Sequence, residues 1–179
     1  MKGAHPNRFD PFSSRQARDI RNNLSKSFLQ ALSEKDPGLY RKKADEYLTQ
    51  NLEHPFQGYV TERLQKFDAV YDCIIRTGAD EKIEQAGLLW DHGLYFEMHE
   101  LLEEVWITAE GGRRKGLQAL IRAAGMKIHA ENNNLKAAAS MGRKARADLE
   151  LYGNSLSDFA GLETVSAEID RTLANMTDV

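Results

Sequence analysis

Hydrophobic residues recur at intervals of three and four along most of this chain, which is the spacing of one face of an α-helix. The first clear series is Ile20, Leu24, Phe28 and Leu32. Sustained two-residue alternation and Asn-Gly or Asp-Gly turns, which would indicate β-hairpins, do not occur in the sequence. The pattern therefore predicts an all-α protein, a helical bundle of about six or seven helices.

Capping and helix-breaking residues set the expected boundaries. We expect the first ten residues to be irregular and Ser13 or Ser14 to be an N-cap, because a serine side chain accepts a backbone N–H at a helix start. Asp80 is the expected cap of the fourth helix, and Gly93 falls inside that helix as a tolerated glycine or a bend. The expected helices cover about residues 15–33, 39–50, 59–76, 80–108, 113–131, 135–152 and 162–176.

The fourth and fifth helices form the centre of the predicted bundle. Only a short Gly111-Gly112 break separates them, which favours a central antiparallel helical hairpin. At 100° per residue, polar side chains fall at the edge of each apolar arc, where antiparallel packing would bring them together, with His92 nearby. The predicted polar cluster consists of His99, Glu103, Gln118, Arg122 and His129.

Charge is distributed unevenly around this hairpin. Residues 80–110 carry nine acidic side chains and one basic, whereas residues 111–146 carry nine basic and one acidic, within a net charge of −3. We expect ion pairs between neighbouring helices, or else a cationic face that holds an anionic ligand. Glu97, Glu100 and Glu104 fall opposite the apolar arc, so we expect them to face solvent or a basic neighbour.

The motifs of the hairpin resemble those of an uncharacterised family, domain of unknown function 309, over about residues 85–151. The residues that carry the resemblance are His99-Glu100-x-x-Glu103-x-x-Trp106, Leu117-Gln118-x-Leu120-Ile121, His129 and Asn134-x-x-Ala137-Ala138. Arg122 departs from the family pattern, which has glutamine there. The resemblance implies an all-helical bundle and no established activity. It divides the chain into an N-terminal accessory helical segment, residues 1–79, and a family-like core with a C-terminal helix, residues 80–179.

Three interpretations of the polar cluster remain open. His99 and Glu103 are spaced i, i+4, so both can reach one divalent metal ion, with His129 as a third ligand in a hydrolase-like centre. Arg122 and its neighbours could instead hold a small anionic ligand. The remaining interpretation is a structural or interaction module, in which the cluster is a hydrogen-bonded network that braces the hairpin.

Other features exclude some classes of function. The isoelectric point of about 6.0 and the lack of a helix-turn-helix or zinc-finger pattern make nucleic acid an unfavoured partner. Apolar runs are far shorter than the ~20 residues that span a bilayer, and no secretory signal is visible. A single cysteine cannot form an internal disulfide. We expect a cytoplasmic protein, with its partners and its assembly into a homo-oligomer left open.

Overall fold

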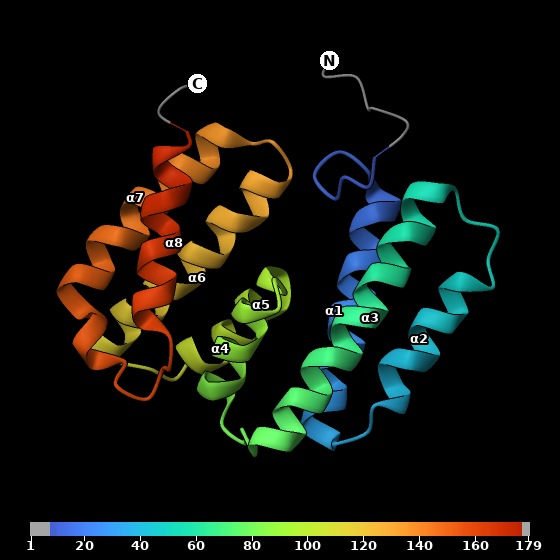
Figure 1. Cartoon of the computed structure of the whole chain (residues 1–179), viewed down its shortest axis with the longest axis horizontal. Helices are drawn as coiled ribbons and strands as arrows, with labels where there is room; N and C mark the ends of the chain where they lie inside the picture. The colour runs from blue at the N-terminus through green and yellow to red at the C-terminus, as the bar shows by residue number, and fades with distance from the viewer. Residues whose placement is uncertain (1–7, 177–179) are drawn as a thin grey trace. The chain divides into compact units, whose positions relative to one another are not determined.

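The computed structural model describes residues 8–176 and divides the chain into two compact units, residues 1–76 and 77–179. The described residues form helices and no strand, so the all-α prediction is confirmed (Figure 1). The expectation for the irregular start falls largely on residues 1–7, outside the described residues. The helices are α1 Arg15–Glu34, α2 Gly38–Leu48, α3 His54–Thr77, α4 Lys82–Asp91, α5 Tyr95–Trp106, α6 Gly111–Glu131, α7 Leu135–Tyr152 and α8 Leu162–Ala174, with a short 3-10 helix, η1, at Gly153–Ser155.

The first unit consists of α1, α2 and most of α3 around an aromatic core. The rings of Phe28 and Phe67 stack with centroids 4.2 Å apart, and Tyr40 meets Phe67 edge-on at 5.7 Å. The Tyr40 hydroxyl donates to Asp68 at 2.8 Å, which satisfies the polar end of a buried ring. The predicted cap is confirmed, because the Ser14 hydroxyl accepts the Ala17 N–H at 3.2 Å.

The predicted start of the third helix is wrong by one turn. The helix begins at His54 rather than near Tyr59, with Pro55 in its first turn. Proline is tolerated at this position because the first N–H groups of a helix have no intrahelical acceptor. His54-Pro55 therefore opens α3 instead of separating it from α2.

The prediction of one long fourth helix is also wrong. Gly93 adopts the left-handed conformation, with φ of 66°, and separates α4 from α5. The turn is closed by backbone bonds from Gly93 to Trp90 at 2.9 Å and from Leu94 to Leu89 at 2.8 Å, which satisfy carbonyls at the end of α4. The cap of α4 is Glu81 rather than Asp80, and it forms a capping box with Glu84. The structure therefore has more helices than expected.

Helix α6 is the centre of the second unit and packs against α5, α7 and α8 (Figure 1). Its closest approach is to α7, where a methionine of each helix lies over a glycine of the other. A Cβ atom added to Gly142 would lie 2.7 Å from the Met126 sulfur, and one added to Gly125 would lie 2.9 Å from the Met141 sulfur. The small residues of these helices thus permit the close packing of their backbones.

The basic residues of α6 and α7 form their ion pairs with acidic residues at positions 148–170, not with the acidic block at 80–110. Within that acidic block, Lys82 meets Glu104 at 2.6 Å. The Arg113 guanidinium hydrogen-bonds Asp158 and holds the pKa of that carboxyl below its usual value. The pairs that join the basic block to the C-terminal acidic residues are Arg113–Asp158, Arg122–Asp148, Lys127–Glu168 and Arg146–Asp170.

None of the helices among residues 8–176 is both long enough and apolar enough to cross a membrane.

Substitution of Gly142 tests the close packing of α6 and α7. We expect Gly142→Ala to lower the free energy of unfolding by about 1–3 kcal/mol, because the new methyl group would overlap Met126 and Leu173. Urea unfolding followed by circular dichroism at 222 nm measures the change, because helices of both units contribute to that signal. Gly58→Ala is the control, because nothing lies within 4 Å of its added Cβ. Equal effects of the two substitutions would contradict the packing argument.

Candidate functional site

Helix α5 places His99 between two carboxylates of its own chain segment. The Nδ1 atom of His99 lies 3.4 Å from Glu100 Oε1, and the Nε2 atom lies 3.8 Å from Glu103 Oε1. Glu103 reaches the ring because it is one helical turn further along, whereas Glu100 reaches it from the adjacent position. These three residues offer ligand atoms that all lie within 4.8 Å of one another.

The imidazole of His99 is less exposed to solvent than the two carboxylates beside it. The His99 side chain is 26% exposed, whereas those of Glu100 and Glu103 are 42% and 52% exposed. The Nδ1 atom of His99 is shielded from solvent and makes no hydrogen bond to another described residue. The imidazole is therefore half-buried while the carboxylates keep access to solvent, so an ion or water can approach this edge of α5.

Two other members of the predicted cluster, Arg122 and His129, have partners elsewhere. Arg122 on α6 forms an ion pair with Asp148 on α7. His129, in the last turn of α6, has Nδ1 3.1 Å from the Asn134 side-chain nitrogen. His129 is not part of the group of potential ligands around His99. A joint role for all five residues thus stays a prediction, and Glu100 is the residue that the sequence reasoning set aside and the structure places beside His99.

The register of α5 and α6 suggests where Gln118 lies along the hairpin. The Arg114 guanidinium lies 3.8 Å from the centre of the Trp106 ring, which pairs the end of α5 with the start of α6. Glu103 lies three residues before Trp106 on α5, and Gln118 lies four residues after Arg114 on α6. Because the two helices are expected to run antiparallel, both residues are about one turn, or ~5 Å, from the Arg114–Trp106 contact in the same direction. Gln118 is half-buried, and among the described residues its side-chain amide has no hydrogen-bond partner.

Glu97 and Glu104, which the sequence analysis expects to face solvent or a basic neighbour, differ in their surroundings. Glu104 meets a basic neighbour, Lys82, as expected, whereas Glu97 is fully buried with 0% exposure and so does not face solvent. The helical projection assumed one long helix with an open far side. Because the chain turns at Gly93, α4 folds back and packs along α5. Lys82 of α4 meets Glu104, so α4 lies on the side of α5 that carries Glu104. Glu97 lies two turns before Glu104 and so faces the same side.

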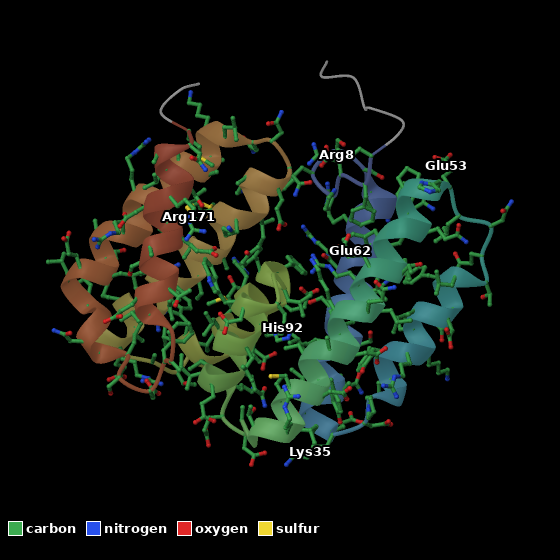
Figure 2. The ribbon with its side chains drawn as sticks, viewed as in Figure 1. Arg8, Lys35, Glu53, Glu62, His92 and Arg171 are labelled. Atoms are coloured by element: carbon green, nitrogen blue, oxygen red, sulfur yellow. The ribbon has the colours of Figure 1, made fainter. Side chains whose placement is uncertain are left out.

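His92 has a structural role at the end of α4, where Figure 2 labels it. Its Nδ1 donates a hydrogen bond to the Leu88 carbonyl at 2.8 Å, because a carbonyl oxygen can only accept. This bond satisfies one of the last carbonyl groups of α4 and fixes the tautomer of the ring. His92 therefore belongs to the turn between α4 and α5.

The two ring nitrogens of His99 can do different chemistry. A metal ion binds one imidazole nitrogen, and the other nitrogen then carries the proton, which it typically donates to a carboxylate. With Glu103 near Nε2 and Glu100 near Nδ1, an ion held by Nε2 and Glu103 would leave Nδ1–H to donate to Glu100. In this arrangement Glu100 orients the imidazole and Glu103 binds the ion.

The hydrogen bond at His129 predicts a pH dependence of stability. Burial lowers the pKa of His129, and Nδ1 must be unprotonated to accept the bond from Asn134. The neutral ring therefore contributes stability that is present above about pH 6.5, the unperturbed pKa of histidine, and is lost as the pH falls through the lower pKa of the folded state. Urea unfolding between pH 8 and 5 should show that loss, and His129→Gln should remove it. An unchanged pH dependence in His129→Gln would contradict this assignment.

Arg114 is predicted to stabilise the end of α5. Its guanidinium covers Trp106 and donates to the carbonyls of Ile107 and Ala109 at 3.4 and 3.2 Å. A lysine cannot make this planar arrangement, so we expect Arg114→Lys to cost about 1–2 kcal/mol of unfolding free energy. Lys115→Met, at an exposed neighbouring position, should change stability by less than ~0.5 kcal/mol. Equal values for the two variants in urea unfolding would refute the role of Arg114.

Comparison with known families identifies the region that carries this site. The family model described as "Domain of unknown function (DUF309)" matches residues 83–141, from the start of α4 into α7. Comparison with curated proteins and with solved structures gives no match. The resemblance predicted from the motifs is therefore confirmed over residues 83–141, and the helices that carry His99, Glu103 and Gln118 lie in a DUF309 region.

Proposed function

We propose that this protein is a helical module that binds a divalent cation through His99 and Glu103, with Glu100 orienting the imidazole. The observation that carries the proposal is the group of three ligand atoms within 4.8 Å of one another on one turn of α5. A cytoplasmic location is part of the proposal, supported by the single cysteine, which cannot form an internal disulfide.

The donor atoms favour a particular class of ion. One imidazole nitrogen and one or two carboxylate oxygens suit zinc, manganese or iron(II) better than calcium or magnesium, which prefer oxygen ligands alone. The remaining coordination positions would be filled by water or by the Gln118 amide oxygen, because the register of α5 and α6 is consistent with Gln118 lying level with Glu103. Two or three protein ligands at a half-exposed position indicate modest affinity.

Local electrostatics favour a cation over an anion at this edge. The segment 80–110 carries nine acidic side chains and one basic, and that one, Lys82, is paired with Glu104. Arg122, which the anionic-ligand interpretation requires, is paired with Asp148. An anion would have to displace that carboxylate and approach a negatively charged helix, so this interpretation is disfavoured.

A purely structural or interaction module is the second candidate. It is favoured by the contacts of His99, since both carboxylates come from its own helix and would hold the imidazole ring in place without any ion. A hydrolase-like centre would additionally need a metal-bound water held beside a substrate. We therefore limit the main proposal to cation binding.

Titration of untagged protein with zinc, manganese or magnesium chloride in a calorimeter tests the proposal. We expect binding of zinc or manganese with an affinity of about 1–100 µM and weaker binding of magnesium. His99→Ala and Glu103→Gln should weaken binding by at least about tenfold, and Glu100→Gln by a similar factor, as is usual when a partner of a ligating histidine is lost. The matched controls are His129→Ala and Glu84→Gln, which should bind as the wild type does.

Two results would reject cation binding. The first is the absence of binding heat and of any rise in melting temperature with all three ions. The second is equal binding by His99→Ala and the wild type, which would place the ion elsewhere. If His99→Ala instead lowers stability in metal-free buffer and no ion binds, the structural candidate replaces the proposal.

A further inference from the structure

The outer face of α7 carries a strip of exposed residues that takes no part in the site on α5. Its members fall within an arc of about 100° when projected down the helix axis and extend over ~22 Å. The cations occupy its first half, and Leu151, with 72% exposure, ends it. We call this the α7 strip, and it consists of Lys136, Ser140, Arg143, Lys144, Ala147 and Leu151.

The three cations of the α7 strip differ from the other basic residues of the same helix pair. Arg122 and Arg146 are paired with Asp148 and Asp170. Within residues 8–176, Lys136, Arg143 and Lys144 form no ion pair. The internal ion pairs of the bundle thus leave a positive charge of three on one face of α7.

A complementary strip lies on α4 of the same unit. Its residues span about 80° of the helix projection and ~15 Å of its length, with acidic side chains on both sides of one leucine. The acidic side chains are exposed and the leucine is half-exposed, and within the described residues none of these carboxylates forms an ion pair. This α4 strip consists of Glu81, Glu84, Leu88 and Asp91.

We propose that the α7 strip binds the α4 strip of a second copy of this chain. The two strips match in charge, three cations against three carboxylates, and each also presents a leucine. Every copy carries both strips. Two copies can therefore form a symmetric dimer with two strip-to-strip contacts, or many copies can form a chain in which each copy binds the next. A second copy is therefore the proposed partner, because it carries a strip whose charge is opposite to that of the α7 strip.

The strength of this association follows from the exposure of its charges. An exposed ion pair contributes little and is screened by salt, so three pairs and two leucines support a weak complex. We expect a dissociation constant of roughly 0.1–1 mM at low salt. Between about 20 and 500 mM sodium chloride the screening length falls severalfold, and the association should weaken at least tenfold.

Sedimentation velocity of the full chain, at concentrations up to about 0.5 mM and at both salt concentrations, tests the proposal. The wild type should sediment faster as concentration rises at low salt only. The variant Lys136→Glu/Arg143→Glu/Lys144→Glu should stay monomeric, as should Glu84→Lys/Asp91→Lys. Mixed in equal amounts, these two variants should associate, because each then meets a strip of opposite charge.

The control is Lys26→Glu/Lys42→Glu/Arg76→Glu, which makes the same change in net charge at exposed residues of the first unit. Circular dichroism at 222 nm confirms that each variant is folded. Control protein should associate as the wild type does. A wild type that remains monomeric under all conditions would overturn the proposal, and so would a mixture of the two strip variants that fails to associate.

Discussion

The close contact between α6 and α7 is the constraint on which the second unit depends. Met126 and Met141 each occupy the space above a glycine of the facing helix, and a single added methyl group at Gly142 would meet sulfur at 2.7 Å. Because a packed interior tolerates little change in volume, this contact fixes the position of α6. Helix α6 in turn packs against α5, and the stacking of Arg114 on Trp106 sets the register between them. The edge that carries His99 is therefore positioned by packing some distance from it.

The division of charge in the chain has a consistent physical meaning in this arrangement. Four cations of α6 and α7 pair with acidic residues at 148–170, so the acidic segment at 80–110 receives little compensation from the basic block that follows it. That residual negative charge surrounds His99 and favours a cation there. Among the described residues, the cations that form no ion pair include Lys136, Arg143 and Lys144 on α7, away from α5. The same distribution thus accounts for a cation site and for a surface that attracts acidic side chains.

Local signals in the sequence determined much of the fold. Helical periodicity predicted the all-α class, and Ser14 was recognisable as a cap. The sequence pattern could not show whether the helix breaks at Gly93 or continues through it. Both possibilities fit the same spacing of apolar residues, and only the packing of α4 against α5 distinguishes them. For the site, the i, i+4 spacing of His99 and Glu103 was readable, whereas the approach of Glu100 depends on its rotamer, which a helical projection does not contain.

Nitrogen-15 NMR of the imidazole rings tests whether the two nitrogens of His99 have the separate roles proposed for them. Long-range proton–nitrogen spectra distinguish the two tautomers and report which nitrogen binds a metal. On addition of zinc, the account predicts that His99 becomes protonated at Nδ1 and coordinated through Nε2, while His92 and His129 keep their signals. Coordination through Nδ1 of His99, or a response confined to another histidine, would contradict it.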